Sequence, residues 1–450
     1  MARPALIVAL LATAAVGTAC LDLPGGAVDP PQAPEAPVQL GPAQYRALWV
    51  DAFHDGIKSQ LQVQKLVADA HRANLNALIV QVRPDGNAYF NKSDEPRASD
   101  IEGTFDPLAY VIKLAHSANP PIEVHAWLNT FFVGTNSDVY KQHGDAWASQ
   151  TDGGERGGFI DPGVPDVQTY THKVFMDVAN NYDIDGLHMD FVRYPSATWG
   201  YNPSAVALYE QQTATHQPPA ADDPRWMAWR RDRVTAFVKD LHADLHNAHP
   251  SVKLSGAFIC FGGGPRNDAE WVYTSAYTSV YQDWRLWLSS GYVDFGVPMN
   301  YDSDWNSLQK GWFDRWSTWE KNSSFANRIL TGVGAFLNYP EETLAQIQRA
   351  LAPSEGGHKV LGVAIYSYGS TSVYGTNDYY GNPDYANALP RQPYFNGITD
   401  QNLLAQRADM LNDWFMTELA LPDRYRDVAL GWVDTKPVFP QPAATPTLGT

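Results

Sequence analysis

Asp190 is the side chain in this sequence best placed for acid–base or nucleophilic chemistry. It lies in the apolar segment DGLHMDFV (185–192), two residues after His188 and three before Arg193. Burial at the end of a strand would raise the pKa of its carboxyl group, whereas the nearby guanidinium would lower that pKa. We therefore expect Asp190 to be catalytic; the alternative is a structural ion pair with Arg193.

A second carboxylate would complete a catalytic pair with Asp190. Asp302 ends the segment VDFGVPMNYD (293–302), two residues after Asn300, and Asp51 lies in an earlier apolar segment. In glycoside hydrolysis one carboxylic acid protonates the leaving oxygen, and a second carboxylate attacks the sugar carbon or activates water. We expect Asp302 to be the partner, with Asp51 as a replacement candidate. The alternative for Asp302 is a loop-capping role.

Amide, aromatic and cationic side chains lie at similar positions and could bind a sugar. Trp127 and Tyr366 would stack on sugar faces, or would only pack the mouth of the fold. Arg83 and Asn129 would hydrogen-bond hydroxyl, acetamido or carboxylate groups, or would bridge neighbouring strand ends. His125 is expected to be a satisfied strand histidine more often than a catalyst. The candidate substrate-binding residues are Asp51, Gln81, Arg83, His125, Trp127, Asn129, His188, Arg193, Tyr194, Asn300, Tyr301 and Tyr366.

Other kinds of site lack their sequence signatures. No His-x-His pair of a barrel metal hydrolase lies in the first strand, and no G-x-S-x-G nucleophile elbow is present. No G-x-G-x-x-G follows the first strand, which argues against a dinucleotide site. Gly332 and Gly334 could form a phosphate loop, but no Lys or Arg accompanies them. Carboxylates, amides and aromatic rings remain, so we expect neither a metal nor a cofactor.

Eight short apolar segments, alternating with amphipathic ones, must position these residues. The strands are expected at 47–53, 77–84, 122–129, 185–192, 252–260, 293–302, 329–336 and 360–369. Asp106-Pro107, Asn202-Pro203 and Asp223-Pro224 are typical helix starts. Eight strand–helix units predict an α/β protein, a (β/α)₈ TIM barrel with elaborated loops at the C-terminal face, where active sites of barrels lie. An open doubly wound sheet is the alternative.

Alternation along each strand predicts which side chains enter the barrel, because successive residues point to opposite faces. We expect the aliphatic face to contact the helices and the polar or aromatic face to point inward. In the sixth strand the expected outer residues are Val293, Phe295 and Val297, and the expected inner ones are Asp294, Asn300 and Asp302. In the eighth strand Tyr366 and Tyr368 are expected inside.

Composition excludes several classes of protein. The 450 residues carry a net charge of −17, which argues against a nucleic-acid partner. Hydrophobic residues make up 44% and charged residues 18%, as in a globular domain with a large core. Two cysteines, Cys20 and Cys260, cannot build a disulfide framework. The 12% aromatic content fits either core packing or a sugar-binding cleft.

The ends of the chain have compositions of their own. Residues 1–20 resemble a signal peptide, and GTAC, ending at Cys20, resembles a bacterial lipoprotein box whose thiol is lipidated. An ordinary cleaved signal is the alternative, and both predict export. Residues 21–42 are a Pro/Gly-rich linker, and residues 436–450 are expected to be a disordered tail. We thus expect one barrel domain over 43–435 in the bacterial cell envelope, as an outer-membrane lipoprotein held by a lipid at Cys20 or as a periplasmic or extracellular protein.

Several motifs together resemble the glycosyl-hydrolase-like family ten. They are RALWVDAF, QVRPDGNAYF (81–90), FDPLAYVIKLAH (105–116), VHAWLN (124–129), FIDPGVPDVQTY (159–170) and DGLHMDFVRYP (185–195), with looser matches at VPMNYD and GVAIYSYG. The resemblance implies a barrel with glycoside-hydrolase activity on a polysaccharide, with bacterial cell-wall glycan (peptidoglycan) as a substrate class. The family's site residues would fall on Asp190, Arg83, His125, Trp127 and Asn129. Segments 262–280 and 371–401 look particular to this chain.

Two functions of different class follow. The first is an exported glycoside hydrolase in which Asp190 acts as acid or nucleophile with a second carboxylate. The second is a catalytically silent barrel that binds glycan and serves as an envelope scaffold. The presence of a second carboxylate close to Asp190 distinguishes the two. The oligomeric state does not follow from the sequence.

Overall fold

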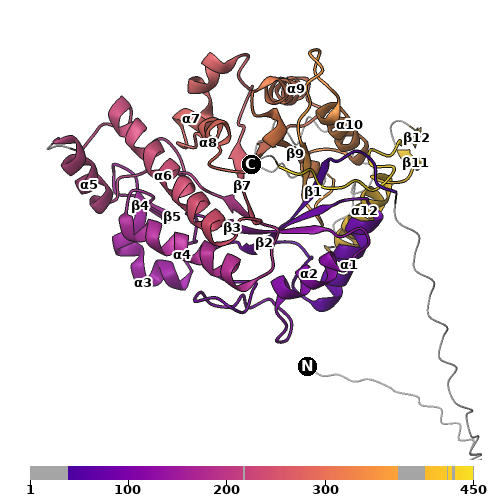
Figure 1. The fold of residues 1–450 in the computed structure, drawn as a ribbon, viewed down its shortest axis with the longest axis horizontal. Coiled ribbons are helices and arrows are strands. Elements are labelled where there is room, and N and C mark those ends of the chain that lie inside the picture. Colours follow the sequence, from indigo (N-terminus) through magenta and orange to yellow (C-terminus); the bar gives the residue numbers. More distant parts are fainter. Residues whose placement is uncertain (1–38, 216–217, 373–400, 423, 428–430, 449–450) are drawn as a thin grey trace, which may run out of the picture. The chain divides into compact units, whose positions relative to one another are not determined.

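Eight parallel strands close into a barrel in the computed structural model, which describes residues 39–448 except 216–217, 373–400, 423 and 428–430 (Figure 1). The barrel strands are β1 (Tyr45–Val50), β2 (Ala77–Arg83), β3 (Glu123–Asn129), β6 (Gly186–Asp190), β7 (Lys253–Ile259), β8 (Phe295–Asn300), β9 (Leu330–Gly334) and β10 (Gly362–Tyr366). They neighbour one another in chain order, and β10 closes onto β1. All eight predicted strands are present, so the predicted (β/α)₈ barrel is confirmed and the open sheet is excluded.

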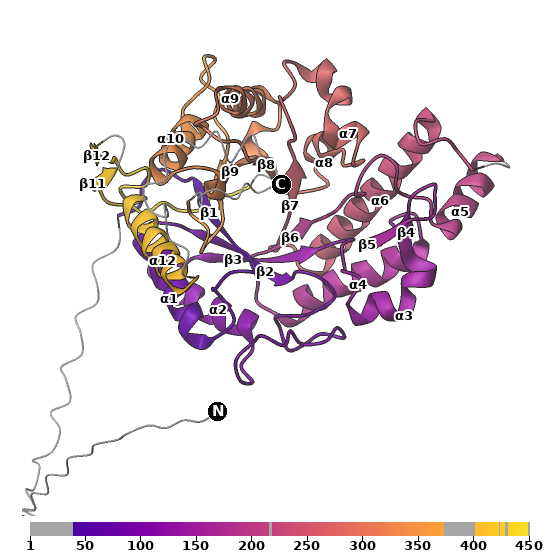
Figure 2. The same ribbon diagram turned by 180° about the vertical axis from the view of Figure 1, so that it is seen from behind.

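Helices surround the strands, as both views show (Figures 1 and 2). They are α1 (Gln60–Arg72), α2 (Pro107–His116), α3 (Asp138–Trp147), α4 (Pro165–Asn181), α5 (Pro203–Thr213), α6 (Pro224–Ala248), α7 (Ser275–Thr278), α8 (Trp284–Ser290), α9 (Ser307–Asn322), α10 (Pro340–Leu351) and α12 (Gln401–Glu418). The 3₁₀ helices are η1 (Asp268–Tyr273), η2 (Ala326–Arg328) and η3 (Ala335–Leu337). Two small hairpins pair β4 (Ala148–Gln150) with β5 (Arg156–Ile160) and β11 (Arg424–Asp427) with β12 (Gly431–Asp434). The β4–β5 hairpin and α5 elaborate the loops after β3 and β6, as predicted.

Short polar residues start the helices where the Asx-Pro pairs predicted. Asp106 accepts a hydrogen bond from the Ala109 N–H at the start of α2, and Asp223 accepts one from the Arg225 N–H at the start of α6. In each helix a proline occupies the first turn, where its missing N–H costs no helical hydrogen bond. These caps fix where each helix begins, and with it the length of the loop at the barrel mouth.

Two apolar layers hold the barrel. Aliphatic residues such as Leu48, Val80 and Leu187 pack between strands and helices. The interior is filled largely by rings, including those of Trp49 and Trp127, which bury the hydrocarbon surface that closing the barrel requires. Much of the aromatic content therefore serves packing.

Predicted side-chain directions are wrong at two places, within β8 and just beyond β10. In β8, Phe295 and Val297 lie in the interior cluster, and Asn300 instead donates from Nδ2 to the Phe313 carbonyl of α9 at 3.1 Å. Alternation carries no information there because both faces of β8 are apolar. Tyr368, beyond the end of β10, donates to Asp69 Oδ2 at 2.8 Å and so faces α1.

Residues 436–448 are ordered against the barrel, contrary to the predicted disordered tail. The Gly41 N–H donates to the Pro442 carbonyl at 2.7 Å, and the Asn76 Nδ2 group donates to the Ala443 carbonyl at 3.0 Å. Phe439 is fully buried, with the Arg46 guanidinium 4.6 Å above its ring. The segment packs beside the starts of β1 and β2 through backbone hydrogen bonds, which leave no periodic sequence pattern.

The predicted signal peptide (1–20), Cys20 and most of the linker (21–42) lie outside the described residues. So does most of the segment 371–401. Within the part of the chain that the structure describes, no helix combines the length and apolar character needed to cross a membrane.

Candidate active site

A cavity of about 680 Å³ lies at the C-terminal ends of the barrel strands. Residues of β1, β2, β3, β6, β7, β8 and β10 and of the following loops line it, and most of that lining is apolar. A few polar side chains in an apolar pocket are typical of a site that orients a small ligand or one unit of a polymer. The predicted residues in this lining are Gln81, Trp127, Asn129, Asp190, Arg193, Tyr301, Asp302 and Tyr366.

Asp190 ends β6 and reaches the cavity as predicted. The Phe191 N–H donates to Asp190 Oδ1 at 2.6 Å, and Phe191 itself has φ +48°. A bulky residue in this left-handed region is uncommon and is a feature of functional sites. Burial raises the pKa of Asp190 to about 6, against the lowering effects of Arg193 and the Phe191 N–H. Asp190 is therefore mostly ionised at pH 7.

Arg193 lies near Asp190 but is held by aromatic rings. Its guanidinium sits 4.8 Å from the centroid of Phe191 and 5.9 Å from that of Phe159. It also donates to the Tyr194 carbonyl at 3.4 Å. Within the described residues no ion pair joins it to Asp190, so its positive charge acts on the carboxylate from a distance. The predicted alternative, a structural ion pair between Asp190 and Arg193, is therefore not supported.

Asp302 lies just beyond β8 on the same cavity. Its backbone carbonyl accepts hydrogen bonds from Asn338 (3.0 Å) and Gln346 (2.8 Å), which fix the loop. Asp302 is 5% exposed, and burial raises the pKa of its carboxyl group to about 8. Asn306, not Asp302, caps α9, so the loop-capping alternative is not supported.

Hydrogen bonds to other protein groups hold the carboxylate of Asp51 outside the lining of the cavity. His54 Nδ1 lies 2.9 Å from its Oδ1, Ser367 donates to its Oδ2 at 2.7 Å, and two backbone N–H groups donate to Oδ1. Burial would raise the pKa of Asp51, but the hydrogen bonds from His54 and Ser367 lower it below its ordinary value. Asp51 is absent from the lining of the cavity, so the structure does not bring it beside Asp190 and Asp302, and its role beside a substrate stays a prediction.

The amides form a fixed row beside Asp190. Gln81 accepts from the Ala52 N–H at 3.0 Å and donates from Nε2 to Asn129 Oδ1 at 3.3 Å. Asn129 donates in turn to the Pro84 carbonyl. This chain of hydrogen bonds sets which amide atoms face the cavity, as recognition of sugar hydroxyls would require.

A layer of rings forms the floor. Trp49 Nε1 donates to His188 Nε2 at 3.2 Å, and His188 Nδ1 lies 2.9 Å from Ser255 Oγ. Burial lowers the pKa of His188 well below its ordinary value, so the ring is neutral. His188 therefore supports Trp49 and is absent from the lining of the cavity, and its binding role stays a prediction.

Two more predicted binding residues, Arg83 and His125, contact other protein groups and are absent from the lining of the cavity. Arg83 makes two hydrogen bonds to Glu95 (2.6 and 2.8 Å), because a bulge between Gln81 and Arg83 turns its side chain away from the barrel interior. His125 lies deeper in the barrel, with Nε2 3.1 Å from Glu123 Oε2.

Tyr194 is buried and donates to Asp161 Oδ1 at 3.2 Å. With Asn300, which faces α9, it completes the set of predicted binding residues that do not reach the cavity.

Aromatic residues at the mouth were missed by the sequence analysis. Phe53 and Phe261 line the cavity and are 71% and 53% exposed, and Phe132 and Trp312 line it as well. Phe261 follows β7 and Phe53 follows β1, so the rule that barrel active sites are built from the ends of strands could have found both.

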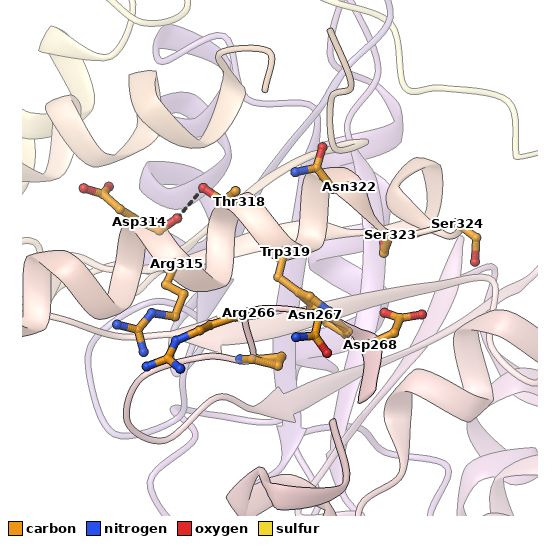
Figure 3. Close-up of a pocket in the computed structure, with 11 residues that line it drawn as sticks. Arg266, Asn267, Asp268, Asp314, Arg315, Thr318, Trp319, Asn322, Ser323 and Ser324 are labelled. Atoms are coloured by element: carbon orange, nitrogen blue, oxygen red, sulfur yellow. Dashed lines mark hydrogen bonds between the residues drawn. The ribbon is translucent and has the colours of Figure 1, made fainter. Parts of the chain in front are cut away.

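Figure 3 shows a second cavity, of about 600 Å³, lined by residues of 265–268 and 314–324 and set away from the strand ends. Its two carboxylates, Asp268 and Asp314, are each paired with an arginine. We therefore place the candidate chemistry in the cavity at the strand ends, which holds carboxyl groups without such partners.

Curated relatives of this chain are named as hydrolases. It is 28% identical over 290 residues to "Glycosyl hydrolase YngK" of Bacillus subtilis (strain 168), covering 57% of this chain and 54% of that protein. It is 24% identical over 367 residues to "Glycosyl hydrolase DigH" of Escherichia coli (strain K12), covering 69% and 79%. The chain thus spans about half the length of YngK.

Solved structures share the barrel. The glycoside hydrolase domain of PgaB (BpsB) from Bordetella bronchiseptica superposes with a TM-score of 0.55 at 16% identity, over 73% of this chain and 94% of that domain. The catalytic domain of β-amylase from Paenibacillus polymyxa gives 0.51 at 12% identity, over 78% and 100%. At such identities the likeness is one of fold. Residues 44–341 match the family described as Glycosyl hydrolase-like 10, and the chain belongs to that family.

Proposed function

We propose that this protein hydrolyses glycosidic bonds of a polysaccharide, with Asp302 as general acid and Asp190 as nucleophile or general base. The observation that carries the proposal is one cavity holding two carboxyl groups whose pKa values differ, about 6 for Asp190 and about 8 for Asp302. At pH 7 about nine-tenths of Asp190 is ionised and about nine-tenths of Asp302 is protonated. A protonated carboxyl group can serve as the acid of glycoside hydrolysis, and an ionised one can serve as the nucleophile or base.

The surrounding side chains fit a sugar ligand. Trp127 and Tyr366 offer ring faces, and Gln81 and Asn129 offer fixed amides that can hydrogen-bond hydroxyl or acetamido groups. Peptidoglycan glycan is the substrate class we propose, on the resemblance of the motifs to the family. We also propose export and a lipid at Cys20, supported by the composition of residues 1–20.

The test is incubation of the purified protein with denuded and intact peptidoglycan and with a panel of polysaccharides. Release of reducing ends is expected from at least one substrate, and Asp190→Asn and Asp302→Asn should each lower it by about 10²-fold or more. Asp223→Asn is the matched control, because Asn caps a helix as well as Asp does and α6 lies outside the cavity. Unchanged release by both cavity variants would remove the proposed roles.

The same experiment addresses a catalytically silent, glycan-binding barrel. Retention of a glycan on the immobilised protein, without reducing-end release from any substrate, would favour the scaffold. Binding measured in Asp190→Asn separates the two further, since that variant should still bind a substrate that it does not cleave.

A further inference from the structure

At the end of the barrel opposite the cavity, two histidines and an aspartate converge. His242 and His246 lie four residues apart on the last turns of α6, and therefore on one face of the helix. Asp294 directly precedes β8. One nitrogen of each ring and one carboxylate oxygen all lie within 4.8 Å of one another. We propose that these residues form a binding site for a divalent transition-metal ion such as Zn²⁺.

The hydrogen bonds of His246 leave one nitrogen for a ligand. Its Nδ1 lies 3.0 Å from the His242 carbonyl, which can only accept, so Nδ1 carries the proton. Its Nε2 lies 3.3 Å from Asp294 Oδ2. Two acceptors at that distance need a cation or a proton between them. A ring nitrogen held by a backbone carbonyl while the other faces a carboxylate is the outer arrangement typical of metal-binding histidines.

The other two ligands are available and differ in stiffness. One ring nitrogen of His242 lies within 4.8 Å of the ligand atoms of His246 and Asp294, and the residue lines the same cavity. Asp294 is clamped to β7, because the Leu254 N–H donates to its Oδ2 at 2.6 Å and its own N–H donates to the Leu254 carbonyl at 2.8 Å. The Asp294 carboxylate is fixed, and rotation of the His242 and His246 side chains can bring their ring nitrogens to the positions of ligands around a tetrahedral ion.

The ligand set indicates the kind of ion. Two imidazole nitrogens and one carboxylate oxygen suit Zn²⁺, and similar sites take Co²⁺ or Ni²⁺. Each of the three residues is half-buried, so an ion can enter and water can supply the fourth ligand. The cavity beside them has a volume of about 650 Å³.

Neighbouring charges set the affinity. Lys253 and Arg328 line the same cavity. Lys253 is neutralised by Glu123, with Nζ 2.8 Å from Oε1. Arg328, which donates to the Val293 carbonyl at 3.4 Å, has no ion pair among the described residues and opposes a bound cation. Removing its charge should strengthen the binding of a metal and weaken the binding of an anion.

The experiment is titration of ZnCl₂ into the untagged, metal-free full chain by calorimetry, with Co²⁺ as a spectroscopic probe. One ion per chain is expected, with the visible absorption of tetrahedral Co²⁺ and a rise in the melting temperature on Zn²⁺ addition. His242→Asn and His246→Asn should each weaken binding at least about tenfold. His249→Asn is the matched control, because the His249 ring, just beyond α6, instead contacts Asn180 of α4.

Measurements on Arg328→Gln test whether the site binds a cation or an anion. Tighter Zn²⁺ binding in that variant supports the proposal. Absence of stoichiometric Zn²⁺ binding, equal binding by His242→Asn, or phosphate binding that Arg328→Gln abolishes would overturn it. Circular dichroism of each variant checks that the barrel is folded. Since the readout is binding, the outcome is independent of whether the protein cleaves glycans.

Discussion

Replacing Asp302 with Asn should stabilise the protein as it inactivates it. The carboxyl group of Asp302 has its pKa raised from its ordinary value of 3.8 to about 8 by burial. Between these two values the folded chain keeps a proton that the unfolded chain releases, so the free energy of unfolding falls as the pH rises. The full difference, reached at about pH 8, is on the order of 5 kcal/mol. An amide has the shape of the protonated acid and cannot ionise, so the variant escapes this loss.

The assay is urea unfolding of the wild type and of Asp302→Asn at pH values from 4.5 to 9. The variant is expected to match the wild type closely at the acid end and to exceed it by several kcal/mol at the alkaline end, while glycan release falls. The titration of Asp190 occurs in both proteins, so it largely cancels in the difference. Asp223→Asn should show no such gain. A stability difference between Asp302→Asn and wild type that stays flat with pH would refute the reasoning, because Asp302 would then be ionised in the folded protein.

Three further predictions concern activity and the core. The pH profile of kcat/KM should be bell-shaped, falling below about pH 6 as Asp190 gains a proton and above about pH 8 as Asp302 loses one; a profile flat from pH 5 to 9 would contradict the assigned roles. Phe261→Ala should raise KM by roughly 2- to 10-fold with kcat and stability little changed, since the ring is half exposed at the mouth, and steady-state kinetics on a soluble glycan would check it. Arg83→Met should lower the free energy of unfolding by about 3–5 kcal/mol because it leaves Glu95 buried without its partner, and a loss below 1 kcal/mol in urea unfolding would argue against that ion pair.

The strands and the two cavity carboxylates could be predicted because each leaves a local pattern. Asp190 follows an apolar strand, and parallel strands in a barrel end at one face, so position along the strand was enough. Asp302 was predicted inside by alternation in β8. It does line the cavity, although Phe295 and Val297 show that the assumed faces of that strand were exchanged.

The remaining errors come from features that alternation does not encode. A bulge after Gln81 reverses the direction of Arg83, and one inserted residue is enough to do so. His125 and His188 lie on the inward face as predicted but in deeper layers, and depth depends on the stagger of strands that only the closed barrel defines. The segment 436–448 is held by backbone hydrogen bonds, which any sequence can make.

The pairing of Gly41 with Pro442 has a consequence for how the barrel can be presented to a substrate. Residues 39–44 and the C-terminal segment both meet the barrel where β1 begins, at the pole opposite the cavity. A fusion partner or solid support joined directly to either end of the described chain would therefore attach at the pole opposite the candidate active site. Attachment at that pole leaves the residues that line the cavity uncovered.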